Sequence, residues 1–168
     1  MNEKPIVIGI MGPGESATKE DCDLAYELGK TLAMENYIVL SGGRNCGVMD
    51  AAMKGAKDGG GRTIGILPGN NKSGMSRYVD IPIITGMGNA RNIINVLTSE
   101  VVVAIGESLG TSSEIALALK VKKPVLALNT SGETSNFYKR LAKPKFIQLD
   151  RFIKAEFILL LNKLVTET

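Results

Sequence analysis

The chain has 168 residues, of which 44% are apolar and 22% charged, values typical of a folded domain and not of a disordered chain. Its formal charge of +3 is spread along the sequence, so charge alone does not indicate a nucleic-acid partner. Histidine is absent, which excludes a histidine base, a histidine metal ligand and the Ser-His-Asp and Cys-His catalytic pairs.

The two cysteines, Cys22 and Cys46, form neither a zinc-binding spacing nor a disulfide framework, and free thiols suit a reducing compartment. No apolar run approaches the roughly 20 residues that cross a bilayer, and the first residues lack the apolar core of a signal peptide. We therefore expect a cytoplasmic protein with no membrane partner and no metal site, made of a single domain over residues 1–168.

Short β-branched runs alternate along the chain with longer segments of helical periodicity. The predicted strands are 6–11, 37–40, 63–67, 81–85, 101–105, 125–128 and 146–149. The predicted helices are 19–35, 47–58, 89–98, 112–121 and 151–165. Steady alternation of strand and helix predicts parallel strands joined by right-handed crossovers. The expected fold is a single α/β, Rossmann-like, doubly wound domain, with helices on both faces of a mostly parallel sheet.

Glycines gather where predicted strands end and helices begin, in loops 12–17, 42–47, 86–91 and 106–111. Each loop could be only a tight turn, but four on one sheet edge favour phosphate binding through the N–H groups of helix starts. The predicted ligand-binding residues, from these loops and from the end of the sixth strand, are Gly12, Gly14, Ser16, Gly42, Gly43, Asn45, Gly47, Met87, Glu107, Ser108, Gly110, Thr111 and Asn129.

Two common nucleotide motifs are incomplete. Loop 12–17 has the glycine spacing of a dinucleotide fingerprint, but no acidic residue ends the second strand to hold a ribose. Loop 42–47 has the glycine spacing of a Walker A loop, but Val48 and Met49 follow it in place of Lys and Ser or Thr. The sequence therefore disfavours NAD binding and ATP hydrolysis of the P-loop type.

Two charged residues each allow two interpretations. The pattern from Thr111 to Glu114 is that of a capping box, in which the glutamate reaches back to the N-cap amide. Alternatively, Glu114 is a carboxylate beside a phosphate-binding loop, able to act as a base or to stabilise a cationic transition state. Arg91 is either a solvated helix residue or a charge aimed at the ligand.

The helical segment from Met49 to Ala56 carries small residues and methionines but few charges, a composition suited to close packing between subunits. Met49 and Met53 are interpreted as core or subunit contacts and not as parts of a cofactor site. Cys46 has no base at hand and is interpreted as an unreactive thiol. We expect a homo-oligomer, a dimer or a pair of dimers.

One ordered set of motifs resembles the lonely-guy (LOG) and molybdenum-cofactor carrier superfamily of Rossmann-like proteins. The set is Ser41-Gly42-Gly43-x-x-x-Gly47-Val48-Met49, then Arg91, then Gly110-Thr111-x-x-Glu114, then Lys123-Pro124-Val125-Leu126-Ala127-Leu128-Asn129. LOG enzymes cleave nucleoside 5′-monophosphates to a free base and ribose 5-phosphate, and carry the signature PGGxGTxxE and an upstream MHxRK stretch. The resemblance covers nearly the whole chain and implies that Arg91 and Glu114 occupy the catalytic positions.

The chain departs from the LOG pattern because Gly106-Glu107-Ser108 replaces PGG and because the neighbours of Arg91 differ from MHxRK. These departures resemble the carrier branch, whose members bind a phosphorylated pterin cofactor and are not established enzymes. Glu107 is expected near the anion, where its charge would oppose a bare phosphate and favour a ligand larger than ribose phosphate.

We therefore predict a protein that binds a phosphorylated nucleotide-like or pterin ligand, such as the molybdenum cofactor, and that requires no cofactor of its own. The first alternative is a LOG-like phosphoribohydrolase that uses Glu114 and Arg91. A DprA-like DNA-handling protein is a distant alternative, because the sequence lacks a basic cluster and an aromatic platform for bases. Some members carry the label of lysine decarboxylase. An enzyme of that class that uses pyridoxal phosphate would be expected to have a His-Lys pair, and this chain has no histidine, so the label has no support here.

Overall fold

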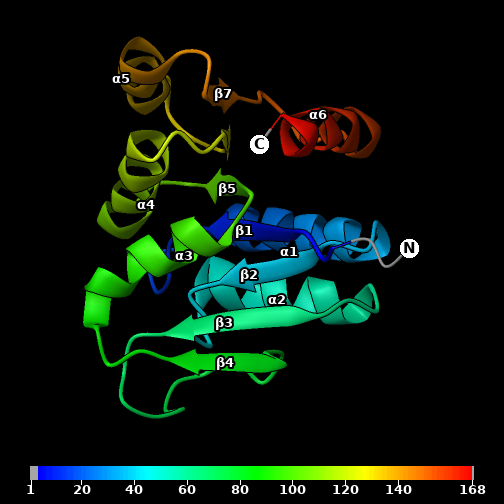
Figure 1. Cartoon of the computed structure of the whole chain (residues 1–168), viewed down its shortest axis with the longest axis vertical. Coiled ribbons are helices and arrows are strands. Elements are labelled where there is room, and N and C mark those ends of the chain that lie inside the picture. The colour runs from blue at the N-terminus through cyan, green and yellow to red at the C-terminus, as the bar shows by residue number, and fades with distance from the viewer. Residues whose placement is uncertain (1–3, 168) are drawn as a thin grey trace.

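The computed structural model describes residues 4–167 and contains one seven-stranded sheet in the order β4-β3-β2-β1-β5-β6-β7 (Figure 1). The strands are β1 (Val7–Met11), β2 (Ile38–Ser41), β3 (Thr63–Leu67), β4 (Ile81–Ile84), β5 (Val101–Ile105), β6 (Val125–Leu128) and β7 (Phe146–Gln148). Neighbouring strands all pair in parallel, so the predicted α/β fold is confirmed and the sheet is parallel throughout.

The helices are α1 (Lys19–Met34), α2 (Gly47–Asp58), α3 (Asn92–Thr98), α4 (Leu109–Lys120), α5 (Gly132–Ala142) and α6 (Lys154–Thr166), with a 3₁₀ turn η1 (Gly88–Arg91) before α3. Helix α5 was not predicted. Its apolar side chains, Phe137, Tyr138 and Leu141, are confined to its second half, and its start is capped by the Ser131 hydroxyl, which accepts a hydrogen bond from the Thr134 amide. None of the described helices is both long and apolar enough to cross a membrane.

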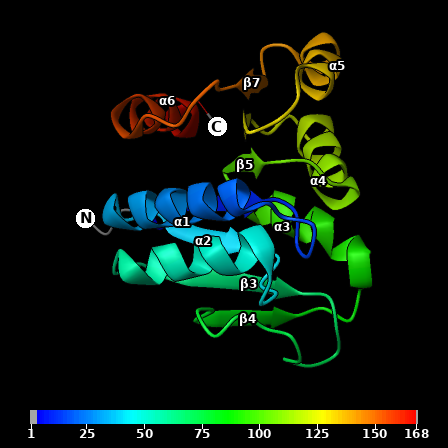
Figure 2. The same ribbon diagram turned by 180° about the vertical axis from the view of Figure 1, so that it is seen from behind.

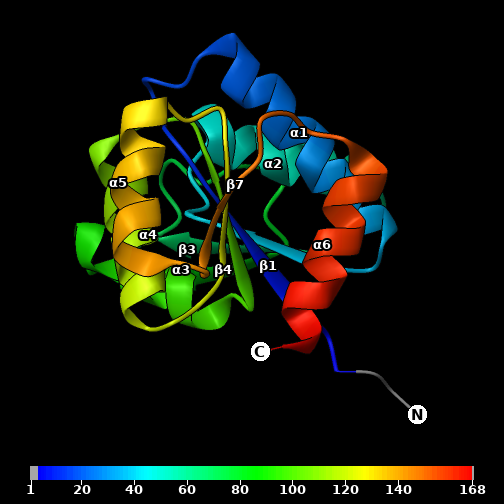
Figure 3. The ribbon, with the colours of Figure 1, turned by 90° about the horizontal axis from the view of Figure 1, so that it is seen from above.

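Helices cover both faces of the sheet, with α1, α2 and α6 on one side and α3, α4 and α5 on the other (Figure 3). Strand β5, next to the central strand β1, alternates between the two cores, because Val101, Val103 and Ile105 face the first group and Val102 and Ala104 face the second. All five of these side chains are fully buried. A strand covered on both faces needs a continuous apolar run, which is why its sequence predicted it.

Helices α1 and α2 lie side by side and touch backbone to backbone (Figure 2). A Cβ atom added to Gly29 would lie 2.1 Å from the carbonyl oxygen of Ala52, and one added to Gly55 would lie 2.0 Å from that of Tyr26. The small residues of α2 that suggested contacts between subunits thus serve packing within the chain. Met53 is fully buried in the core, and the homo-oligomer stays a prediction without support from α2.

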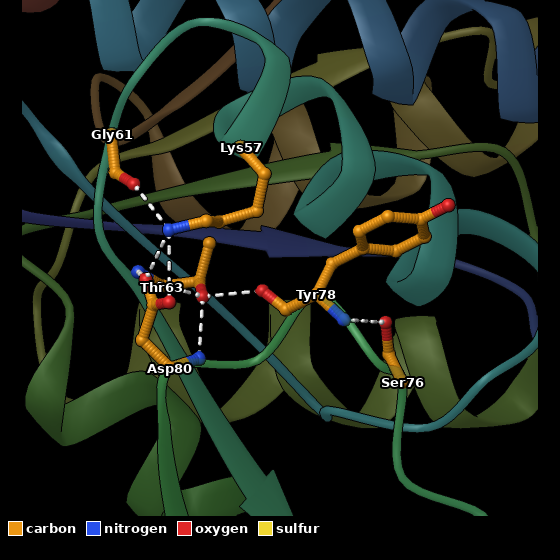
Figure 4. Close-up of polar contacts among 6 residues, drawn as sticks. All are labelled: Lys57, Gly61, Thr63, Ser76, Tyr78 and Asp80. Carbon is orange, nitrogen blue, oxygen red and sulfur yellow. Dashed lines mark hydrogen bonds and ion pairs between the residues drawn. The ribbon is translucent and has the colours of Figure 1, made fainter.

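A polar network joins the end of α2 to the starts of β3 and β4 (Figure 4). The Asp80 carboxylate accepts hydrogen bonds from the Lys57 ammonium at 2.8 Å and from the Thr63 amide at 3.0 Å. The Thr63 hydroxyl donates to the Tyr78 carbonyl at 2.6 Å and accepts from the Asp80 amide at 2.8 Å. The network therefore anchors the end of the long 68–80 connection.

We expect an Asp80→Asn substitution to lower the stability at pH 7 by about 1 kcal/mol, the scale of a partly exposed ion pair. Burial acts to raise the pKa of Asp80, but the bonds from Lys57 and Thr63 outweigh it and lower the pKa below 3.8. A lowered folded-state pKa contributes stability above the unfolded-state value, and this is lost as the pH falls through the folded value. Thermal unfolding at pH 7 and pH 3 should therefore show the difference shrinking in acid. Equal losses at both pH values, or the same loss for the exposed Asp150→Asn control, would contradict it.

Candidate functional site

The four glycine-rich loops meet at the carboxyl edge of the sheet and line a cavity of about 380 Å³, which we call the loop pocket. It lies by the switch point between β1 and β5, where ligands bind in open α/β sheets. Its lining residues are Ile10, Met11, Gly12, Gly14, Glu15, Ser16, Gly42, Arg44, Met49, Asn89, Arg91, Asn92, Ser108, Leu109, Gly110 and Glu114. The expectation that these loops converge is confirmed.

A larger cavity of about 650 Å³ lies beside α1 and the connection from β7 to α6. Its walls are exposed charged side chains of α1 and of Asp150 and Arg151, with Leu24, Leu128, Asn129 and Phe152, and none of its charged side chains is buried. The loop pocket is lined by all four glycine-rich loops and by the buried Arg91 and Glu114, so we place the candidate site there.

The first turn of α4 is open toward the loop pocket. Ser108 is the N-cap of this helix, and its hydroxyl accepts a hydrogen bond from the Thr111 amide at 3.1 Å. The amides of Leu109 and Gly110 precede the first possible intrahelical acceptor, as at any helix start. A Cβ added to Gly110 would meet only the Ser108 hydroxyl, at 3.7 Å. This turn offers free N–H donors, the positive end of a helix dipole and space for an anion.

Glu114 lies in the second turn of α4, so the capping-box interpretation is wrong. The cap is Ser108, three residues earlier than the pattern indicated, and the Glu114 side chain is turned inward and buried. Its Oε1 accepts a hydrogen bond from Asn95 Nδ2 at 2.7 Å. Burial raises the pKa of Glu114 to about 7, against the opposing effects of Asn95 and of the positive charge of Arg91. At neutral pH this carboxyl group can therefore either donate or accept a proton.

Arg91 is buried at the floor of the loop pocket, so the solvated-residue interpretation is wrong. Its guanidinium donates hydrogen bonds to the main-chain carbonyls of Gly42 and Ile66, at the ends of β2 and β3. Burial lowers the pKa of Arg91, an effect opposed by Glu114. Arg91 thus braces the pocket floor through the main chain and supplies a positive charge to it.

Two buried polar atoms lie unpaired beside these groups. Within residues 4–167, Arg91 Nε and Asn95 Oδ1 have no hydrogen-bond partner. Arg91 Nε is a donor and Asn95 Oδ1 is an acceptor. Asn95 is hydrogen-bonded to Glu114, and the positive charge of Arg91 acts on the pKa of Glu114. A buried polar atom left unpaired is costly, so each of these two atoms is a candidate to pair with water or with a polar group of a ligand.

Comparison with known proteins identifies the family. Residues 5–155 match the SLOG cluster4 family. The chain belongs to the SLOG cluster4 family. The molybdenum cofactor binding protein of Rippkaea orientalis is 46% identical, with a TM-score of 0.92 over 96% of this chain and 98% of that one. The molybdenum cofactor carrier protein of Chlamydomonas reinhardtii is 44% identical, with a TM-score of 0.90 over 97% and 99%.

A more distant solved structure, DNA processing protein A from Helicobacter pylori, is 25% identical with a TM-score of 0.69 over 95% of this chain and 81% of that one. This SLOG cluster4 protein is therefore a homologue of molybdenum cofactor carrier proteins, with a Rossmann-like fold that also occurs in a DNA-handling protein.

Seven of the predicted ligand-binding residues of this SLOG cluster4 protein do not line the loop pocket. They are Gly43, Asn45, Gly47, Met87, Glu107, Thr111 and Asn129. Gly43 and Gly47 have positive φ angles of 71° and 54° and permit close approach to Gly65 and to the Gly14 carbonyl, respectively. Thr111 is buried behind Ser108. These three positions serve backbone packing of the loops.

Glu107 does not line the loop pocket, so the geometry gives no support to the expectation that its charge selects a larger ligand there. Its carboxylate accepts a hydrogen bond from the Ser131 amide at 2.7 Å, and bonds from Ser131 and Thr134 lower its pKa. Glu107 and Asn129 line a separate groove, where Asn129 donates to Asp21 at 2.6 Å. Both residues tie the starts of α1 and α5 to the sheet edge.

Several pocket residues of this SLOG cluster4 protein were not singled out from sequence. Glu15, Arg44, Asn89 and Asn92 all line the loop pocket, and each lies within or next to a glycine-rich loop. A polar side chain beside such a glycine was the signal that could have found them. Met49 is buried, in agreement with its interpretation as a core residue, and it also lines the pocket.

Proposed function

We propose that this SLOG cluster4 protein binds a phosphorylated pterin, the molybdenum cofactor, in the loop pocket and carries it without chemical turnover. The observation that supports this most is the open first turn of α4, which faces the pocket and presents free amides at Ser108 to Gly110. The homology to molybdenum cofactor binding and carrier proteins over nearly the whole chain supports the choice of ligand.

The residues of the pocket fit such a ligand. A volume of about 380 Å³ lies in the range of small-molecule sites. The phosphate would lie at Ser108 and Gly110, where amides and a hydroxyl donate to it. Asn89, Asn92 and Glu114 offer amide and carboxyl groups that pair with the N–H and carbonyl edges of a heterocycle. Arg91, whose Nε is unpaired, lines the pocket, and Asn95 lies behind it, bonded to Glu114.

The test is mass spectrometry of the ligand that co-purifies with the protein from cells that make the cofactor, compared between two matched glycine variants. Gly110→Val fills the space before α4, whereas Gly132→Val adds the same side chain to the first turn of α5, where a Cβ meets nothing within 4 Å. We expect Gly110→Val to reduce bound pterin at least about tenfold, because the anion is pushed beyond hydrogen-bond reach. The control should keep the wild-type amount. Equal pterin in both variants, or none in the wild type, would contradict the proposal.

One observation favours a second candidate, a LOG-like phosphoribohydrolase. A carboxyl group whose pKa is about 7 suits a general acid at neutral pH, and Glu114 lines the pocket beside the proposed phosphate position. Release of free base from AMP, GMP, CMP and UMP separates the two candidates. A carrier releases none, whereas rapid release by wild type that is lost in Glu114→Gln would establish the hydrolase. The distant DNA-handling alternative predicts binding of single-stranded DNA. Single-stranded DNA is therefore tested as a further ligand in binding experiments with the wild type.

A further inference from the structure

An ion pair spans the mouth of the loop pocket. Glu15 follows β1 and Arg44 follows β2, and both side chains line the pocket. Arg44 Nη2 is bonded to Glu15 Oε1, and Nη1 lies 3.5 Å from Oε2, so the carboxylate faces the guanidinium through both oxygens. A phosphate group would meet a guanidinium in this same two-pronged way. Neither residue was singled out from sequence, and neither has a role in the core.

The two partners are held unequally. Arg44 sits on a backbone fixed by the 68–80 connection, because the Asn45 amide donates to the Gly74 carbonyl at 2.8 Å and the Ser76 amide to the Gly43 carbonyl at 2.9 Å. Glu15 lies at a turn, and its side chain is 71% exposed against 40% for Arg44. The main chain of Arg44 is therefore fixed, whereas the Glu15 carboxylate is mostly exposed and can turn into water.

Arg44 also lies beside the anion-binding elements. A Cβ added to Gly14 would be 3.8 Å from Arg44 Nη1, which places the guanidinium next to the first glycine-rich loop. Its charge reaches the pocket floor, where it adds to the effect of burial in lowering the pKa of Arg91. With Glu15 bonded to Arg44 the mouth is locally neutral, and without Glu15 it is positive.

We propose that Glu15 occupies the position of the ligand phosphate on Arg44, and that the phosphate of an incoming ligand displaces it. The proposal rests on the proposed phosphate site in the loop pocket. On binding, the N–H donors of Arg44 exchange carboxylate oxygens for phosphate oxygens, and the Glu15 carboxylate returns to water. A doubly charged phosphate ester competes for Arg44 better than a carboxylate does, because its charge is larger. Glu15 thus makes the site select phosphate esters over singly charged anions.

The test measures the affinities for AMP and for inorganic phosphate by isothermal titration calorimetry. We expect Glu15→Gln to bind both probes about two- to fivefold more tightly, the scale of an exposed ion pair that no longer competes. Arg44→Gln should bind at least about tenfold more weakly, because a charge-assisted contact is lost. In the variant with both substitutions, Glu15→Gln should no longer tighten the binding of either probe, because there is no Arg44 guanidinium to free from the ion pair.

The matched control is Glu35→Gln, which removes the same charge after α1, at the opposite edge of the sheet from the loop pocket. This control should bind like the wild type. Unchanged or weaker binding by Glu15→Gln, or an equal gain in the Arg44→Gln background, would overturn the proposal, since the effect would then be one of net charge alone.

These outcomes are separate from those of the proposed function. Phosphate exchange that follows the expected pattern, in a protein that co-purifies with no pterin, would refute the carrier proposal and support the role of Glu15. A protein that co-purifies with pterin, but whose phosphate affinity does not change in Glu15→Gln, would support the carrier proposal and refute the role of Glu15.

Discussion

Replacing Glu114 with glutamine is expected to stabilise the protein above pH 7 and to have little effect near pH 4.5. Burial raises the folded-state pKa of Glu114 to about 7 from 4.5, so the folded protein binds this proton more tightly than the unfolded chain does. The wild type therefore loses stability as the pH rises from about 4.5 to about 7. Glutamine keeps an oxygen that accepts the Asn95 hydrogen bond and carries no charge. The gain at pH 8 should be on the order of 2–3 kcal/mol.

Urea unfolding at pH 5 and pH 8 measures this gain, with Glu27→Gln on the exposed face of α1 as the control. The control removes a carboxylate that is in water in both states, so its stability should follow the wild type at both pH values. A Glu114→Gln protein that is less stable than wild type at pH 8 would show that the ionised carboxylate stabilises the fold through Arg91. The buried carboxyl would then be a structural ion-pair partner.

Replacing Arg91 with methionine is expected to destabilise the protein by about 2–5 kcal/mol. Its guanidinium is the donor to the Gly42 and Ile66 carbonyls, and leaving each buried carbonyl unpaired costs about 1–3 kcal/mol. Methionine preserves much of the side-chain volume, so the loss reports the hydrogen bonds more than a cavity. The same variant should also lose ligand affinity, because the ends of β2 and β3 at the pocket floor lose their common donor.

Thermal and urea unfolding of Arg91→Met measure the loss, against Arg62→Met, which removes an exposed guanidinium just before β3. The control should change the stability by less than about 0.5 kcal/mol, as is usual for surface substitutions. If Arg91→Met unfolds like the wild type while its binding is weakened, the guanidinium acts as a ligand contact and not as a brace.

The sequence predicted the inner strands well because the sheet, apart from the exposed edge strand β4, is covered on both faces. Continuous β-branched runs such as 101–105 have no other stable place in a domain of this size. The polar helix α5 could not be predicted in this way. Its order comes from the Ser131 cap and from Tyr138, which is buried against Phe146 with ring centroids 5.4 Å apart. Such contacts join residues from different elements and leave no periodic signal.

The candidate site, like the fold, could be predicted only in part. Glycine-rich loops after parallel strands predicted where the pocket lies, because topology alone brings those strand ends together. The partners of the charged residues followed no local pattern. Arg91 bonds to main-chain carbonyls of two other strands, and Arg44 is placed by a connection that returns over loop 42–47 from residues 68–80. Ser108 and Thr111 lie three residues apart at the start of α4, and either could cap the helix. Because Ser108 is the cap, Glu114 lies in the second turn and faces inward.

The close backbone contacts that Gly29 and Gly55 allow between α1 and α2 have a consequence for ligand exchange. These helices begin directly after the loops that contain Gly14 and Gly42, so a shift of one loop against the other would require two interlocked helices to slide. The loops that belong to α1 and α2 therefore stay preorganised, and a guest molecule loses little affinity to ordering them. Helix α4 lies across the sheet from this pair, and its glycine, Gly110, makes no comparable backbone contact. If the pocket widens to admit a ligand, we therefore expect the first turn of α4 to be the part that moves.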